Sequence, residues 1–186
     1  MLDSVLVKVH HILCVDTRGD FAPKKIGQLA DDDFELLDRI ILITALTVEL
    51  LEEAVCYVKT ELLSSHRIPL VIVDNISVPF RTLSIDDIGS RIAAIRKIGL
   101  ALRELLLQPL TLLIVNHMTT RFINEETSRL VPALGENWAA ITDLRLLLEE
   151  RSTTRAMVIL RSDLEDFGQK ELLFRINSKG LDFSLR

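Results

Sequence analysis

The chain has 186 residues, of which 48% are hydrophobic and 26% are charged, and its formal net charge is −5. This composition excludes disordered, collagen-like and low-complexity proteins, because the chain can bury an apolar core of ordinary size. The length predicts a single domain over residues 1–186. No apolar run approaches the roughly 18 residues that a membrane-spanning helix needs, so we expect no membrane segment.

Charge is distributed unevenly along the chain. Residues 1–90 contain 8 Lys and Arg against 15 Asp and Glu, whereas residues 91–186 contain 14 against 12. The overall negative charge argues against an autonomous protein that binds nucleic acid tightly. The second half nevertheless predicts a weakly basic surface.

The sequence lacks the residue spacings of the common metal and nucleophile sites. Cys14 and Cys56 are not part of a C-x-x-C pair, so we expect two buried free thiols in a reducing compartment. His10, His11 and His66 have no partners at metal-ligand spacing, and no G-x-S-x-G motif occurs. Trp138 is expected to be a core residue.

The first half of the chain alternates short apolar runs with helical patterns. The apolar runs predict buried strands at 12–15, 39–43, 70–74 and 110–115. Apolar spacings of three and four predict one helix over 47–62 and a longer one after a capping box at 84–87. The inner face of the longer helix is expected to contain Ile88, Ile92, Ile95, Gly99, Leu102 and Leu106.

The second half predicts a different organisation. Residues 118–136 are expected to form a loop, and strands follow near 141–148, 156–161 and 171–177 without helices between them. This order predicts an α/β fold with a mostly parallel, twisted sheet flanked by helices and an antiparallel C-terminal extension.

Polar residues follow several of the predicted parallel strands. Ligands of such sheets bind at the carboxyl ends of the strands, so one rim is the candidate site. It comprises Asp16, Thr17, Asp74, Asn75, Asn116 and His117. An apolar strand that ends in Asp74 is typical of a Walker B element, whose carboxylate holds Mg²⁺ through water. Its companion phosphate loop, G-x-x-x-x-G-K-[ST], is missing, because none of the seven glycines is followed by Lys.

Five segments together resemble the eukaryotic RecA-like recombinase paralogues, most closely the branch called paralogue C. The segment L-V-I-V-D-N-I-S-V-P-F-R at 70–81 resembles the family's Walker B region. The other four are V-D-T-R-G-D-F at 15–21 (I-D-T-E-G-x-F in the family), N-H-M-T-T at 116–120 (N-Q-M-T-T), L-V-P-A-L-G-E-N-W at 130–138 (L-V-P-A-L-G-E-S-W) and F-R-I-N-S-K-G at 174–180 (F-x-I-x-x-x-G). The segments occur in the family's order at compatible spacings, so the resemblance implies a RecA-like core.

The resemblance also implies roles for the rim residues. Asp74 would hold Mg²⁺ of ATP, and Asp16, Asn116 and His117 would lie beside the nucleotide. Arg18 stands where the family has the Glu that activates the attacking water, and a cation cannot act as that base. His117 replaces the Gln that senses the γ-phosphate. We therefore expect a chain with little or no catalytic activity, either an isoform or fragment of a longer protein or a protein without ATP binding of its own.

By resemblance, residues 118–136 match the second DNA-facing loop of the family, and the stretch after Arg81 matches the first. Thr119, Thr120, Arg121 and Arg129 are the expected contacts to single-stranded DNA. The expected function is that of a nuclear partner subunit in homologous-recombination repair and meiosis, in complex with other recombinase paralogues and the recombinase. Two alternatives remain: a DNA-dependent ATPase whose phosphate loop lies on a longer form, and a structural adaptor that binds neither ATP nor DNA.

Overall fold

The computed structural model of the chain describes residues 10–81, 83, 87–122, 124, 127–152, 154–162, 171–178 and 180–183. It contains two compact units. The first comprises Met1–Pro23 and Phe34–Ile141, and the second comprises Lys24–Asp33 and Thr142–Arg186. The single domain over residues 1–186 stays a prediction.

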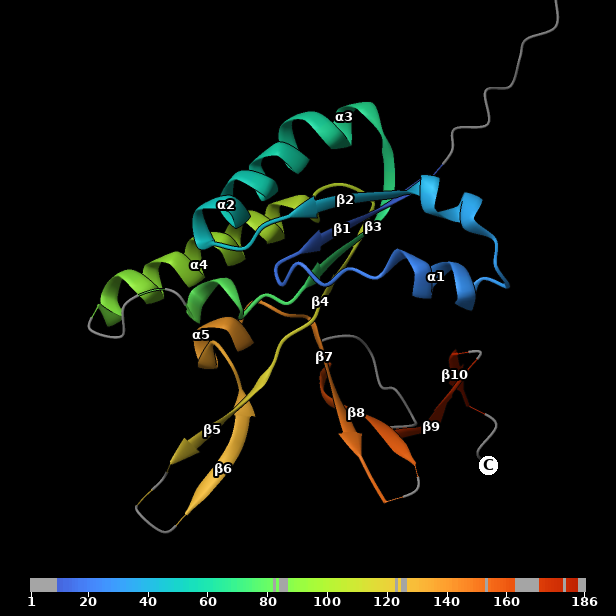
Figure 1. Cartoon of the computed structure of the whole chain (residues 1–186). Helices are drawn as coiled ribbons and strands as arrows, with labels where there is room; N and C mark the ends of the chain where they lie inside the picture. The colour runs from blue at the N-terminus through green and yellow to red at the C-terminus, as the bar shows by residue number, and fades with distance from the viewer. Residues whose placement is uncertain are drawn as a thin grey trace, which may run out of the picture. The chain divides into compact units, whose positions relative to one another are not determined.

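The first unit is built on a four-stranded parallel sheet in the order β2-β1-β3-β4. Its strands are β1 (His10–Asp16), β2 (Ile40–Thr44), β3 (Arg67–Asp74) and β4 (Thr111–Ile114). Cys14 of β1 lies opposite Leu42 of β2 and Ile72 of β3, so β1 and β3 are the inner strands. The predicted strands are confirmed. Their carboxyl ends lie along one edge of the sheet (Figure 1).

Two helices pack against one face of this sheet. α2 (Val48–Tyr57) continues through the π-helix η2 (Val58–Leu62) into α3 (Leu63–Ser65), and α4 (Ile88–Leu105) lies beside α2 (Figure 1). Alternate residues of β1 and β3 point toward these helices, as strand geometry requires. The shared core contains Leu13, Val15, Val71, Val73, Leu51, Val55, Val58, Ile95, Ile98 and Leu102. An α/β fold with a parallel sheet flanked by helices is therefore confirmed.

Side-chain caps set the starts of both helices. Thr47 accepts a hydrogen bond from the N–H of Leu50 (3.3 Å), and Asp87 accepts one from the N–H of Ser90 (2.9 Å). The expectation that Ser84 is the cap is wrong, because Asp87 itself is the N-cap residue and the helix begins at Ile88. Residues 84–86 lie outside the described part of the chain.

The residues expected on the inner face of α4 are buried only in the middle of the helix. Ile95, Gly99 and Leu102 are buried, but Ile88 is 66% exposed and Leu106 is 36% exposed. The buried positions Ile98 and Leu105 were not expected. The buried residues of α4 form a stripe that is wider than one row of side chains, and this stripe packs against the rest of the first unit. The first turn of α4 lies outside this packed region.

The segment expected as a loop at 118–136 contains regular structure. β5 (Met118–Phe122) and β6 (Ser128–Pro132) form a two-stranded antiparallel hairpin, and the short α5 (Gly135–Ala139) follows. The five residues of β5, M-T-T-R-F, and of β6, S-R-L-V-P, do not alternate regularly between polar and apolar, so periodicity does not mark these strands. Trp138 of α5 is buried, as predicted, and lies against Gly99 of α4.

The second unit contains an antiparallel sheet in the order β10-β9-β8-β7. Its strands are β7 (Leu144–Glu150), β8 (Arg155–Ser162), β9 (Glu171–Asn177) and β10 (Gly180–Asp182). The first three confirm the predicted antiparallel strands, whereas β10 was not expected.

The short helix α1 (Pro23–Leu29) was also not expected from the sequence. The 3-10 helix η1 (Phe34–Arg39) precedes β2.

The two cysteines differ in exposure. Cys14 is buried within β1, as expected, but Cys56 is exposed on α2. The expectation of two buried thiols is wrong for Cys56, because this residue lies on the face of α2 that is turned to solvent.

Within the described ranges, no helix is long and apolar enough to cross a membrane.

Candidate functional site

The rim residues expected from sequence lie together where β1, β3 and β4 end. Asp16 lies opposite Asp74 in the β1–β3 ladder. The backbone of β4 joins β3 just beyond Asp74, since the N–H of Ile76 donates to the carbonyl of Val115 (2.9 Å). Asn116 and His117 follow directly. The roles that the resemblance implies for these residues stay predictions.

Asp16 holds the turn that follows β1. Its Oδ1 accepts hydrogen bonds from the N–H groups of Arg18 and Gly19 (2.9 Å each), and its Oδ2 accepts one from Phe21 (3.0 Å). Gly19 adopts a left-handed conformation with φ +73° at this turn. Burial raises the pKa of Asp16, but the backbone donors at Arg18, Phe21 and Gly19 and the charge of Arg18 outweigh it and lower the pKa below its usual 3.8. Both carboxylate oxygens are thus engaged by the backbone.

Thr17 and Asn75 connect the ends of β1 and β3. The Thr17 hydroxyl donates to the Asn75 carbonyl (2.6 Å), and the Asn75 N–H donates to the same hydroxyl oxygen (2.8 Å). The Thr17 N–H also donates to the Asp74 carbonyl (2.8 Å). Thr17 and Asn75 are each 1% exposed. This buried contact fixes the spacing of the two strand ends.

A chain of polar contacts runs from Asn75 to the end of β4. The Asn75 Oδ1 accepts from the N–H (3.0 Å) and the hydroxyl (2.8 Å) of Ser77. The Ser77 Oγ lies 3.3 Å from Nδ1 of His117, and Nη2 of Arg81 lies 3.0 Å from the same nitrogen. Because a guanidinium can only donate, Nδ1 of His117 accepts this contact from Arg81.

Asp74 and Asn116 supply the free oxygen atoms of the rim. Asp74 is half-buried, and its carboxylate has no hydrogen-bond partner among the described residues. Asn116 donates through Nδ2 to the Ala133 carbonyl (2.9 Å), while its Oδ1 is buried without a partner in the same part of the chain. Carboxylate and amide oxygens are ligands suited to Mg²⁺. A role of Asp74 and Asn116 in holding Mg²⁺ stays a prediction, and the 186 residues contain no loop of the kind that cradles phosphates.

The two other candidate groups near the rim are unsuited to catalysis as a base or a nucleophile. Arg18 forms an ion pair with Asp20 (2.7 Å) on the surface of the turn. Burial raises the pKa of the Cys14 thiol to about 11, and the charges of Asp16 and Asp74 add to this effect. A thiol held in its neutral form is a poor nucleophile.

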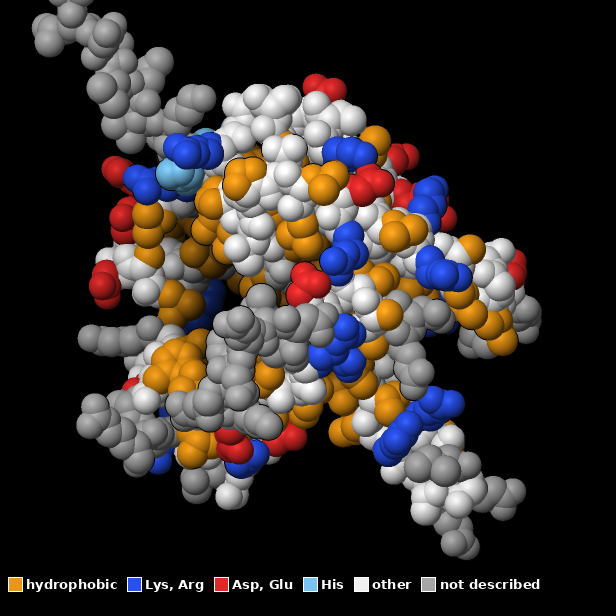
Figure 2. Space-filling view, turned by 180° about the vertical axis from the view of Figure 1, so that it is seen from behind, with side chains coloured by type: hydrophobic (Ala, Val, Ile, Leu, Met, Phe, Trp, Pro, Cys, Tyr) orange, Lys and Arg blue, Asp and Glu red, His pale blue; other side chains and the backbone are white. Residues whose placement is uncertain are grey.

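The residues expected to contact DNA lie on the β5–β6 hairpin. Thr119, Thr120 and Arg121 belong to β5, and Arg129 belongs to β6; all four are exposed. Arg121 lies directly opposite Arg129 in the ladder, and Thr119 lies opposite Val131. Thr119, Arg121 and Arg129 lie on one face of the hairpin, whereas Thr120 lies on the other face with Phe122 and Leu130. Figure 2 shows basic side chains, drawn in blue, on this hairpin.

Two residues of the rim network were not selected from the sequence. Ser77 and Arg81 occur in the Walker B-like segment, but no residue pattern marks them as partners of His117. Their contacts depend on the turn after β3 and on the 3-10 helix η3 (Pro79–Arg81). In the sequence, these two residues stand out only by lying between the candidate residues Asp74 and Asn116. Most of the expected first DNA loop, after Arg81, lies outside the described residues.

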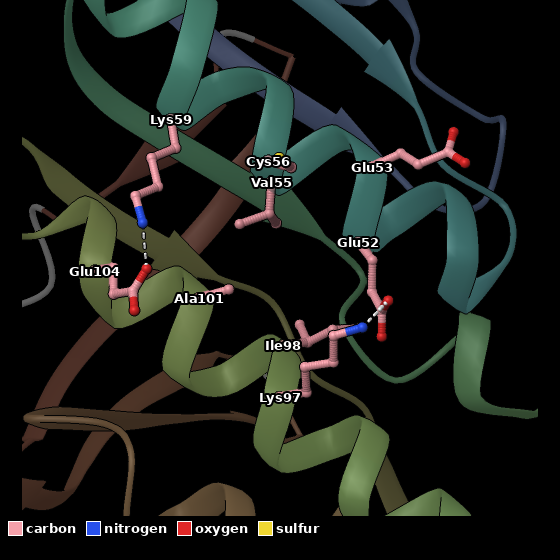
Figure 3. A pocket seen from close by; sticks show the side chains of 9 residues that line it. All are labelled: Glu52, Glu53, Val55, Cys56, Lys59, Lys97, Ile98, Ala101 and Glu104. Carbon is pink, nitrogen blue, oxygen red and sulfur yellow. Dashed lines mark hydrogen bonds and ion pairs between the residues drawn. The ribbon is translucent and has the colours of Figure 1, made fainter.

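A hollow of about 420 Å³ lies between α2 and α4, and its lining shares no residue with the rim (Figure 3). Lys59 pairs with Glu104 (2.5 Å) and Lys97 pairs with Glu52 (2.6 Å), so two ion pairs bridge the helices across it. Among the described residues, no group of three or more His, Cys, Asp or Glu side chains is placed to hold a metal ion.

Curated proteins that are similar to the chain include two DNA repair proteins. The chain is 33% identical over 130 residues to DNA repair protein RAD51 homolog 3 of Cricetulus griseus, a match that covers 67% of this chain and 33% of that protein. It is 26% identical over 158 residues to the protein of the same name from Dictyostelium discoideum, covering 72% and 41%. No protein-family model matches the chain. The chain spans less than half the length of these relatives, and the similarity supports a place among RecA-like RAD51 paralogues.

Proposed function

We propose that this chain is a RecA-like recombinase paralogue of the kind named RAD51 homolog 3, and that it serves homologous-recombination DNA repair as a partner subunit. Support comes from the similarity to two DNA repair proteins and from a parallel sheet whose polar rim leads directly into an exposed hairpin. Other recombinase paralogues and the recombinase are the proposed partners, and the nucleus is the proposed location. Co-purification of tagged chain with these proteins tests the partners, and its failure would favour an unrelated role.

The pairing of Arg121 with Arg129 is the observation that carries the proposed contact with single-stranded DNA. Like charges directly opposite each other in a ladder destabilise a hairpin, so an anion that neutralises both arginines would remove that cost. Nucleic-acid phosphates are such anions, and the neutral hydroxyl of Thr119 lies on the same face. The opposite face presents Phe122, which is 75% exposed, and Leu130, which is 68% exposed. Apolar and aromatic side chains of this kind can stack on unpaired bases.

A salt titration of single-strand binding tests this contact. Two phosphate contacts contribute a slope of about −1.4 in log affinity against log salt concentration on single strands. We expect the double variant Arg121→Ala/Arg129→Ala to bind more weakly at low salt and to lose about that much slope. The control variant Arg67→Ala/Arg96→Ala removes two exposed arginines elsewhere in the first unit and is expected to leave both quantities unchanged. Unchanged affinity and slope in Arg121→Ala/Arg129→Ala would favour the adaptor without DNA binding.

The second candidate function, a DNA-dependent ATPase, rests on Asp74 and Asn116. When bound, Mg²⁺ would neutralise phosphate charge, and these two residues would hold it through water. His117 would lie next to them, positioned by Ser77 and Arg81. Arg18 cannot accept a proton from an attacking water, and no phosphate-cradling loop occurs within the 186 residues. We therefore propose binding to partners and DNA, not ATP hydrolysis, as the function of this chain.

A further inference from the structure

His11 and His66 contact each other although they lie far apart in the chain. His11 belongs to β1, and His66 follows α3 directly before β3. Their ring centroids are 5.1 Å apart, and their ring planes are nearly perpendicular, at 85°. Two imidazoles that bind one tetrahedral ion, with metal–nitrogen distances of about 2.0–2.1 Å, have ring centroids about 5 Å apart. The observed spacing therefore suits a metal ion shared by the two rings.

The Nδ1 atom of His11 lacks a hydrogen-bond partner. It is buried, and no donor or acceptor reaches it within the part of the chain that the structure describes. Burying a polar atom without a partner is unfavourable, whether the nitrogen carries a proton or a lone pair. The β1–β3 ladder also shifts its register between His10 and Ile12, an irregularity of the kind that re-aims a side chain. A metal ion would give Nδ1 of His11 a partner.

Ser65 fixes the position of the proton on the other ring. Its hydroxyl donates to the carbonyl of Glu61 (2.8 Å), and its Oγ lies 2.8 Å from Nδ1 of His66. Because the hydroxyl proton is directed to Glu61, Nδ1 of His66 is the donor in the second contact. In the neutral ring, Nε2 of His66 then holds the lone pair. A histidine that binds a metal has this arrangement, since one ring nitrogen ligates the ion and the other donates to an oxygen atom.

The surroundings of His66 suit a cation that enters from solvent. His66 caps the carboxyl end of the continuous helix α2–η2–α3, and the partial negative charge of a helix end favours a positive ion. His66 is exposed, so an ion has an entry path and the ring can adjust as the ion binds. Arg67 is exposed as well, and water screens its opposing charge.

The two imidazoles are the protein ligands of this site. No third His, Cys, Asp or Glu side chain completes a metal-binding group in the described ranges. His10 is exposed, but neighbouring residues of a strand point to opposite faces, so His10 is not expected to join His11. Water molecules would fill the remaining positions around the ion. Imidazole ligands suit Zn²⁺, Cu²⁺ and Ni²⁺.

We propose that Nδ1 of His11 and Nε2 of His66 bind one divalent transition-metal ion of the zinc type. The ion joins the start of β1 to the residue before β3, at the end of these strands that lies away from the polar rim. An ion that binds the folded chain and not the unfolded chain stabilises the fold. The proposal goes beyond the DNA repair function and does not depend on it.

Calorimetric titration of the untagged chain with zinc chloride tests the site, and the thermal midpoint of unfolding is a second measurement. We expect one ion per chain at the tightest site and a higher midpoint when zinc is present. His11→Ala and His66→Ala should each weaken binding by about tenfold or more and abolish the shift of the midpoint. His10→Ala removes a neighbouring exposed imidazole and should leave both measurements unchanged. Circular dichroism of each variant reports whether it folds.

Ser65→Ala provides a sharper measurement, because Ser65 does not touch the ion. Loss of its Oγ removes the acceptor that orients the His66 ring, and we expect zinc to bind about tenfold more weakly. Ser64→Ala is the matched control: it removes the neighbouring hydroxyl, which also donates to the Glu61 carbonyl (2.7 Å), and should not change binding. A wild-type chain that binds no zinc overturns the proposal. So does binding that persists unchanged in His11→Ala or His66→Ala, or that His10→Ala weakens equally.

Discussion

Thr17 and Asn75 lie 58 residues apart in the chain and exchange two buried hydrogen bonds through one hydroxyl group. The contact joins the ends of β1 and β3, and therefore sets the distance between Asp16 and Asp74. Asn75 Oδ1 also accepts the hydroxyl of Ser77, whose Oγ lies 3.3 Å from Nδ1 of His117. The Thr17–Asn75 contact is therefore linked to the end of β4 through Ser77.

Removing the Thr17 hydroxyl tests this contact. Thr17→Val leaves the N–H of Asn75 buried without its partner, whereas the Asn75 carbonyl still accepts from the N–H of Val78 (3.2 Å). We expect this variant to lower the free energy of unfolding by about 2 kcal/mol. Thr17→Ser retains the hydroxyl and is expected to cost about 1 kcal/mol or less, for the lost methyl group. Urea unfolding followed by circular dichroism measures both. A loss in Thr17→Val that is no larger than the loss in Thr17→Ser would contradict the role of the hydroxyl.

Asp16 predicts a specific acid sensitivity. Its pKa is lowered in the folded state, so its contribution is fully present above the usual value of 3.8 and is lost as pH falls through the folded value. Asp16→Asn cannot accept all three backbone N–H groups and is expected to cost about 1–3 kcal/mol at neutral pH. Unfolding free energies measured between neutral and strongly acidic pH should converge for wild type and variant. Curves that stay parallel would contradict the assignment.

Two glycines of α4 form a matched pair for packing. A Cβ at Gly99 would collide with the side chain of Ile141 and meet the Trp138 ring at 3.5 Å, whereas one at Gly89 would meet only Asp87 Oδ1 at 3.7 Å. Overpacking costs about 1–3 kcal/mol, and alanine recovers up to about 1 kcal/mol of helix propensity. Gly99→Ala should therefore lower the thermal midpoint, and Gly89→Ala should leave it unchanged or raise it. The reverse order would mean that the side chain of Ile141 moves away at little cost.

We expect no DNA-stimulated ATP hydrolysis by the purified chain above background. The physical reason is that Arg18 is paired with Asp20 and cannot act as a base, and that no phosphate-cradling loop is present in the 186 residues. A phosphate-release assay with and without single-stranded DNA measures this, with Asp74→Ala as the reference. Hydrolysis by the wild type that disappears in Asp74→Ala would instead support the ATPase.

The sequence alone determined the parallel strands and the polar residues at their ends. Short apolar runs such as L-V-I-V-D at 70–74 predict buried strands, and parallel strands necessarily bring their carboxyl ends to one edge. Asp16, Asp74 and Asn116 were placed on one rim by this reasoning. Local patterns suffice there because each strand is specified by its own residues.

Only the tertiary structure decided what those side chains do and how the remaining segments pair. The carboxylate of Asp16 accepts backbone hydrogen bonds from the turn after β1, and Oδ1 of Asn116 has no partner among the described residues. Nη2 of Arg81 contacts Nδ1 of His117. The loop expected at 118–136 is a hairpin that sets Arg121 against Arg129. These features depend on hydrogen bonds and registers between residues distant in the chain, and no local period of apolar residues encodes them.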